Sequence, residues 1–200
     1  KHGWFTEWPR IREVVPAGSG QPSRMLMNIH GLWFDFPPRF SAQDTSGLRP
    51  LGSYLKITGD FCHFHDKIVF ACDDTAITGG NRFVNQSQSN FWFTTWEQLG
   101  QCGRPAGWGG PWLQDNVKAG QSSDPYLFAG FQQRVLHLTH AADTPVTFTL
   151  ETDHRGDGQW AELQRIRVPA KGHRYQVLDS ALPAQWIRLK LDADAPGVTA

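Results

Sequence analysis

Residues 134–168, RVLHLTHAADTPVTFTLETDHRGDGQWAELQRIRV, decide the fold class. The runs at 134–140, 146–152 and 160–168 are short and rich in β-branched, aromatic or alternating residues, and turn residues such as Asp-Gly separate them. Residues 126–129, 175–178 and 186–191 have the same character. A 3.6-residue periodicity is absent apart from a single turn around residues 95–99. The sequence therefore predicts an all-β protein.

The upstream half has similar strands. Residues 61–64 and 67–72 predict a hairpin around His65 and Asp66. Residues 90–95 predict a strand with Trp92 and Thr94 on one face. Related segments recur along the chain: MNIHGLWFDFP, HFHDKIVFACDD, SNFWFTTW and GFQQRVLHLTH. Such recurrence is typical of β-propeller blades, although tandem Ig-like sandwiches give a similar spacing.

We accordingly expect residues 1–133 to form propeller blades and residues 134–200 to form either the last blade or a small C-terminal β-sandwich. The chain begins at Lys1 without a methionine and stops at Ala200 as if leaving a strand. We therefore expect the C-terminal blades of a longer propeller, with the N-terminal blades missing.

Composition narrows the range of partners. The 200 residues have a formal net charge of zero, and only 19% are charged. No cluster of lysine or arginine favours a nucleic acid, and no apolar run reaches the roughly 18 residues of a membrane-spanning helix. We expect neither a nucleic-acid nor a membrane partner.

Tryptophans are concentrated in residues 86–112, QSQSNFWFTTWEQLGQCGRPAGWGGPW. Trp92, Trp108 and Trp112 lie there among glycines, prolines and uncharged polar residues. A sugar ring can stack on an indole while its hydroxyl groups find polar partners. The alternative is that these rings fill the space between stacked sheets.

Several segments resemble one known family. QSQSNFWF, G-x-P-x-GWGGPW and VKAG-x-x-SDPYL-x-x-GF-x-x-RVLHLTH resemble the C-terminal half of a bacterial and fungal family of seven-bladed propellers, and HDKIVFACDDTA resembles one of its inner strands. Its members release L-rhamnose from rhamnosyl-α-1,4-glucuronate ends, as lyases or as α-L-rhamnosidases. The resemblance covers residues 50–200 well and residues 1–50 loosely.

This resemblance implies an enzyme that acts on arabinogalactan-type glycans. We expect a secreted or periplasmic monomer whose partner is an oligo- or polysaccharide. The cofactor is unknown, although the central channel of such a fold can hold a structural calcium ion. The principal catalytic histidine of the family lies in an early blade, and no position of this sequence matches it.

Three histidines are candidates for proton transfer. His63 and His65 are two residues apart, so on a strand both project from one face. Such a pair can serve a sugar site, bind zinc with a third ligand, or bond to nearby backbone. His30, in MNIHGLWFDFP, lies on an expected strand beside Gly31, where a ligand can approach closely; the alternative is a core histidine.

Uncharged amides provide the expected polar contacts. Gln86, Gln88 and Asn90 alternate along one face, where paired donors and acceptors suit vicinal hydroxyl groups, although a solvated loop is an alternative. Gln88 is assigned to the catalytic group because a glutamine here can polarise a glycosidic oxygen or position a water molecule. Arg82 is the candidate clamp for a uronate carboxylate, with a surface arginine as the alternative.

Carboxylates and cysteines give weaker signals. Asp73 and Asp74 are adjacent on a strand, so they cannot face each other as the two carboxylates of a retaining glycosidase. Cys62 and Cys72 face each other only if the intervening loop is centred on Lys67; otherwise they are buried thiols. The competing functional hypotheses are a non-catalytic glycan-binding module and a propeller that serves protein contacts.

Overall fold

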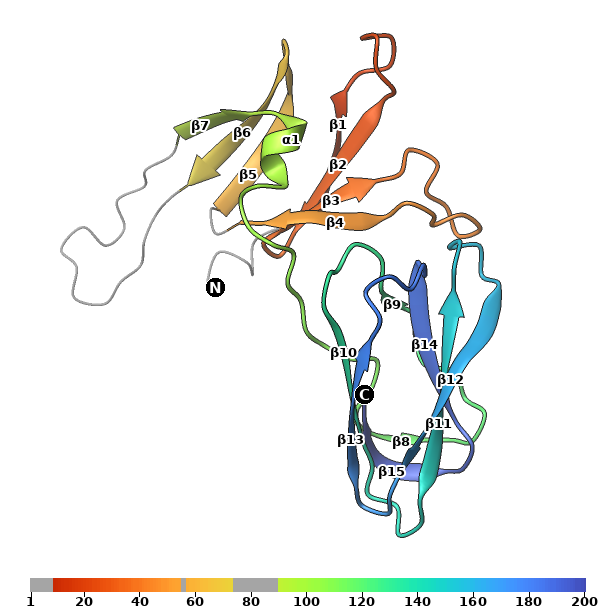
Figure 1. The fold of residues 1–200 in the computed structure, drawn as a ribbon. Coiled ribbons are helices and arrows are strands. Elements are labelled where there is room, and N and C mark those ends of the chain that lie inside the picture. The colour runs from red at the N-terminus through yellow and green to blue at the C-terminus, as the bar shows by residue number, and fades with distance from the viewer. Residues whose placement is uncertain (1–8, 55–56, 74–89) are drawn as a thin grey trace, which may run out of the picture. The chain divides into compact units, whose positions relative to one another are not determined.

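The computed structural model describes residues 9–54, 57–73 and 90–200. These residues contain fifteen strands and one short helix, so the all-β prediction is confirmed. The strands form four antiparallel sheets, none of which closes into a barrel (Figure 1). The chain divides into two compact units: unit 1 is Lys1–Pro38 with Leu48–Ala106, and unit 2 is Arg39–Gly47 with Gly107–Ala200.

The first sheet of unit 1 is a four-stranded meander. Its strands pair in chain order: β1 (Arg10–Val15), β2 (Arg24–Ile29), β3 (Leu32–Phe36) and β4 (Arg49–Ser53). His30 and Gly31 form the two-residue turn between β2 and β3, with φ angles of 49° and 82°. Glycine adopts this left-handed region without strain, and paired positive φ angles match the twist of a hairpin. The expectation that His30 lies on a strand is therefore wrong.

The second sheet of unit 1 has three strands. β5 (Ile57–Phe64), β6 (Lys67–Asp73) and β7 (Asn90–Thr94) also pair in chain order. The predicted hairpin around His65 and Asp66 is confirmed, because Phe64 lies opposite Lys67. The predicted alternation on β7 is confirmed as well, since Thr94 is buried whereas Phe91 is 71% exposed.

A single helical turn follows β7. The helix α1 (Trp96–Leu99) begins after Thr95, whose backbone N–H donates to Oε1 of Gln98 at 3.0 Å. Leu99 is buried against the same core as Trp33, Phe61 and Phe70. This core buries the apolar faces of both unit 1 sheets.

Unit 2 is a β-sandwich of two four-stranded sheets. One sheet has the order β13 (His173–Leu178), β10 (Arg134–Thr139), β15 (Ala195–Thr199) and β8 (Leu113–Val117). The other has the order β12 (Trp160–Val168), β11 (Val146–Asp153), β14 (Trp186–Leu191) and β9 (Tyr126–Leu127). Consecutive strands alternate between the sheets over much of the chain, which is the strand order of a jelly roll.

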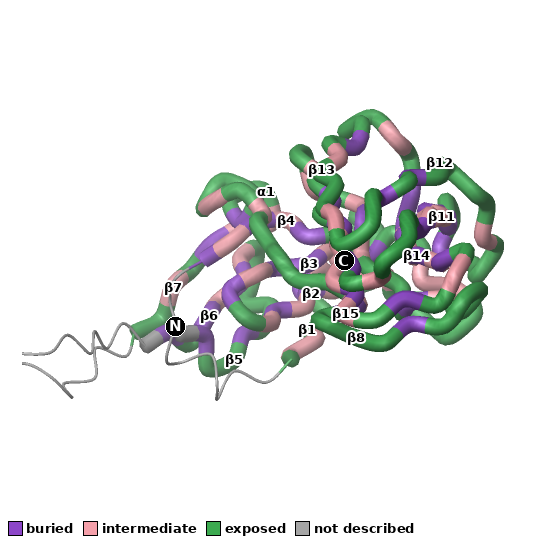
Figure 2. Tube along the Cα trace, turned by 90° about the horizontal axis from the view of Figure 1, so that it is seen from below, coloured by how far each residue is buried: buried purple, intermediate pink, exposed green. Residues whose placement is uncertain are grey.

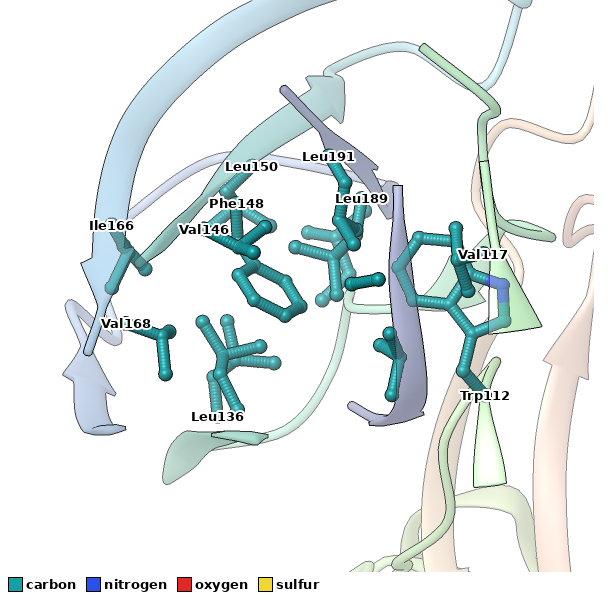
Figure 3. Close-up of a cluster of buried hydrophobic side chains, with 14 of the residues drawn as sticks. Trp112, Val117, Leu136, Val146, Phe148, Leu150, Ile166, Val168, Leu189 and Leu191 are labelled. Atoms are coloured by element: carbon teal, nitrogen blue, oxygen red, sulfur yellow. The ribbon is translucent and has the colours of Figure 1, made fainter. Parts of the chain in front are cut away.

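The core of the sandwich lies between its two sheets. Figure 3 shows Leu136 of β10 facing Phe148, Val168 and Leu189, all three of which come from the other sheet. Buried and half-buried residues alternate along β11, as expected for a strand with one face on a core. Buried positions lie mainly on strands, while most loop residues are exposed (Figure 2).

A buried aspartate organises one turn of unit 2. The carboxylate of Asp153 is 2% exposed and accepts backbone N–H bonds from Gly156 and Gly158, both at 2.8 Å. The carbonyl of Gly156 accepts a bond from the backbone N–H of Thr45, and the indole N–H of Trp186 donates to Thr45 Oγ1 at 2.7 Å. Residues 39–47 are thereby anchored to unit 2.

The sandwich includes more of the chain than residues 134–200, the segment that the sequence analysis predicts as a last blade or a small C-terminal β-sandwich. Strands β8 and β9 precede residue 134, yet they complete the two sheets formed by β10 to β15. Pairing of β8 with β15 joins segments about eighty residues apart, and no local pattern of side chains marks it.

Candidate functional site

A pocket of about 540 Å³ lies in unit 1. It brings together His30 and Trp92, two candidates that are far apart in the sequence. The remaining lining residues combine aromatic rings, small polar groups and two thiols. They are Gly31, Leu32, Trp33, Ser53, Tyr54, Thr58, Cys72, Cys102 and Ala106.

Stacked aromatic rings form one wall of this pocket. The ring of Trp33 stacks on Tyr54, with centroids 4.5 Å apart, and on Trp92, with centroids 5.5 Å apart. Phe70 lies behind them and stacks on Trp92 at 5.2 Å. Trp33 is only 2% exposed, whereas Trp92 is half-buried. Trp92 is therefore the more accessible indole of the wall, and Trp33 holds it in place.

The wall contains one unmet hydrogen-bond donor. The indole N–H of Trp33 is buried and has no hydrogen-bond partner within the described residues. Leaving such a donor unmet costs about 1–3 kcal/mol. A ligand oxygen that reached this group would recover that energy. The hydroxyl of Tyr54, by contrast, accepts a bond from Nδ2 of Asn28 at 3.2 Å.

The described lining residues include no carboxylate, lysine or arginine. Burial raises the pKa of the Cys102 thiol, which keeps it protonated at neutral pH and makes it a poor nucleophile. The imidazole of His30, exposed at its hairpin turn, is the lining group that best suits proton transfer. The pocket as described suits an uncharged ligand with one apolar face.

His63 and His65 lie elsewhere in unit 1. His63 is on β5, but His65 is in the turn with φ of 52°, so the shared-face argument for the pair does not apply. Both line a separate pocket of about 550 Å³ together with Trp96 and Glu97. No group of three metal-ligating side chains is present among the described residues, and this includes the surroundings of His63 and His65.

The remaining candidates are distributed between the units. Asn90 is exposed at the start of β7. Trp108 of unit 2 is 92% exposed, while Trp112 is 7% exposed and packs in the core of the sandwich beside Val117 (Figure 3). Burial of Trp112 leaves little of its ring for stacking on a ligand. Arg82, Gln86 and Gln88 lie outside the described residues, as does Asp74.

The cysteines are not cross-linked to each other. Cys62 lies opposite Val69, and Cys72 lies opposite Thr58, so no disulfide joins Cys62 to Cys72. The turn between β5 and β6 has two residues, His65 and Asp66, and this turn length sets the register of the two strands.

Sequence reasoning missed Trp33 and Tyr54. Trp33 is the second residue after the turn His30-Gly31. A His-Gly pair between two apolar runs was the available signal for a hairpin that presents an aromatic residue near its turn. Tyr54 follows β4 and had no comparable signal.

Comparisons with protein-family models, with curated proteins and with solved structures found no match. Within the part of the chain that the structure describes, no helix is long and apolar enough to cross a membrane.

Proposed function

We propose that the unit 1 pocket binds the end of a glycan chain. The observation that carries this proposal is the aromatic wall of Trp33, Tyr54 and Trp92 beside small polar groups, in a pocket whose described lining has no carboxylate, lysine or arginine. A pyranose ring presents an apolar C–H face that stacks on indole and hydroxyl groups that need polar partners. Ser53, Thr58 and the indole N–H of Trp33 supply such partners.

The proposed architecture around this pocket is part of a β-propeller. The meander of β1 to β4 has the strand number and order of one blade, and β5 to β7 form a second meander. Propellers gather ligand-binding residues from successive blades at one end of the central channel. In this proposal the jelly roll of unit 2 is an appended domain.

A second candidate function is cleavage of the bound glycan. His30 at the pocket can act as base or acid, and the resemblance of the sequence favours removal of terminal L-rhamnose from glucuronate by a secreted enzyme. In a β-elimination, a cation must neutralise the uronate carboxylate before the adjacent proton can leave. Arg82 is the proposed cation.

Isothermal titration calorimetry with a rhamnosyl-α-1,4-glucuronate disaccharide tests binding. We expect Trp92→Ala to weaken binding about tenfold, because stacking on an aromatic ring contributes on the order of 1–1.5 kcal/mol. Phe93→Ala is the matched control, since Phe93 is the next residue on β7 and points to the opposite face. Equal affinity of both variants for the disaccharide would refute the proposed site.

Product analysis tests cleavage. Incubation of the full chain with gum-type arabinogalactan should release rhamnose, with an unsaturated uronate if the reaction is an elimination. His30→Asn preserves the turn, because asparagine tolerates positive φ, and should abolish release while leaving disaccharide binding in place. If the chain binds the disaccharide and releases nothing, the non-catalytic glycan-binding module is the correct reading.

A further inference from the structure

Unit 2 contains its own pocket, of about 130 Å³, at an edge of the sandwich. Leu136 and Leu178 of one sheet and Ile187 and Leu189 of the other contribute to its lining. A single water molecule needs roughly 10–15 Å³ of such volume, so the pocket has room for on the order of ten waters. That is the scale of one sugar ring and not of a polymer segment.

Arg134 places a positive charge in the wall of this pocket. Its Nη1 donates to the carbonyl of Leu182 at 3.0 Å, and its guanidinium lies 4.0 Å from the centroid of the Phe128 ring. It forms no ion pair within the described residues, whereas Arg188 in the same lining pairs with Glu151. A partly desolvated guanidinium without a carboxylate is costly, and it favours an anionic ligand.

Burial also affects the pKa of Arg134. Desolvation lowers the pKa of the Arg134 guanidinium, and the charge of Asp179 opposes the shift only in part. The group stays cationic at neutral pH, because arginine begins from a very high pKa. A bound carboxylate would supply the missing counter-charge.

The rest of the lining suits a ring with an apolar face. Tyr126 and Phe131 contribute aromatic surface, and Gln133 contributes an amide. Gly107 and Gly109 also line the pocket. A Cβ added at Gly109 would lie 3.3 Å from the Tyr126 hydroxyl. Trp108 lies between these two glycines and is 92% exposed, so a further aromatic face is available beside the pocket.

We propose that the unit 2 pocket binds a single carboxylate-bearing sugar, with the carboxylate on Arg134 and the ring against Tyr126 and Phe131. The sugar is either a free uronic acid or the terminal uronate of a glycan. This site is independent of the unit 1 pocket, whose described lining is uncharged.

Calorimetry on the full chain tests the proposal with four probes: D-glucuronate, a disaccharide with a terminal glucuronate, D-glucose and inorganic phosphate. We expect D-glucuronate to bind at least tenfold more tightly than D-glucose, because a charged hydrogen-bonded pair forms only with the acid. Tighter binding of the disaccharide identifies the chain end as the ligand, and equal binding identifies the free acid. Phosphate binding as tight as that of D-glucuronate, or equal binding of D-glucose, overturns the proposal.

Substitutions locate the site. Arg134→Gln should weaken D-glucuronate binding about tenfold or more, and Arg134→Lys should retain part of it. Arg155→Gln is the control, since Arg155 is exposed and pairs with Asp157 in the same unit. Tyr126→Ala removes an aromatic ring against which the sugar packs and should weaken binding severalfold, which keeps the test decisive if Arg134→Gln fails to fold.

Unchanged D-glucuronate affinity in either folded variant, Arg134→Gln or Tyr126→Ala, overturns the proposal. Trp92→Ala separates this site from the unit 1 pocket, because it should leave D-glucuronate binding intact. Weaker binding of the rhamnosyl-glucuronate disaccharide in Trp92→Ala with D-glucuronate binding preserved supports both sites.

Discussion

Asp153 offers the sharpest test of how unit 2 is held together. Its carboxylate accepts four backbone N–H bonds, from Arg155, Gly156, Asp157 and Gly158, at 3.1, 2.8, 3.4 and 2.8 Å. Replacement by alanine removes the two oxygens that accept all four bonds, from a site where the residue is 2% exposed. The backbone donors of the turn then depend on water.

The expected loss follows from the two short bonds. A hydrogen bond to a charged group contributes about 1.5–3 kcal/mol, so the bonds to Gly156 and Gly158 together contribute roughly 3–6 kcal/mol. Arg155, Asp157 and Gly158 are exposed, and water can therefore satisfy part of the turn after the substitution. We expect Asp153→Ala to lower the free energy of unfolding of unit 2 by about 3 kcal/mol.

Urea unfolding of the full chain, followed by tryptophan fluorescence and circular dichroism, measures this effect. With a slope near 1.5 kcal/mol/M, the midpoint of the unit 2 transition should fall by roughly 2 M. Asp157→Ala is the matched control in the same turn, because its exposed ion pair with Arg155 contributes at most about 1 kcal/mol. If the two variants unfold within about 0.5 kcal/mol of each other, the role assigned to Asp153 is refuted.

Two further predictions concern the same unit. Gly156→Ala should lower the free energy of unfolding by at least about 2 kcal/mol, because its φ is +74° and a Cβ would lie 2.7 Å from Thr45 Oγ1. Gly158 has a φ of +79° and open space around it, so Gly158→Ala should lower the same free energy by only about 1 kcal/mol in the urea assay. Burial alone would raise the pKa of Glu151, but hydrogen bonds from Lys190 and Arg188 lower the pKa overall. The contribution of Glu151 to stability is therefore present above about pH 4.5 and is lost as the pH falls through the lowered pKa. Unfolding of Glu151→Gln should therefore depend less on pH in the acid range, and a pH dependence equal to that of the unchanged chain would contradict this assignment.

Local pattern was enough to predict the strands with one buried face. The hairpin at His65 and Asp66, the alternation of Trp92 and Thr94 on β7, and the bounds of β12 and β14 all follow from side-chain periodicity and turn residues. The turn at His30 was missed, because the apolar run continues on both sides of it.

Long-range pairing and burial were beyond the reach of local pattern. Trp108 and Trp112 are four residues apart in one glycine-rich segment, yet one is exposed and the other packs in a core. Only the pairing of β8 with β15 and the jelly-roll order determine which ring is covered. For the same reason the sequence alone could not reveal the pocket that joins His30 with Trp92, since the β2–β3 turn and β7 are about sixty residues apart in the chain.

Indole NMR signals give the most direct test of glycan binding in the unit 1 pocket. The chain has nine tryptophans, so a ¹⁵N-labelled sample shows up to nine indole N–H signals, which single substitutions assign. Addition of the rhamnosyl-glucuronate disaccharide should shift the signals of Trp33 and Trp92 and leave that of Trp112, which is buried in the core of unit 2, in place. Saturating disaccharide that moves neither the Trp33 nor the Trp92 signal would contradict the account.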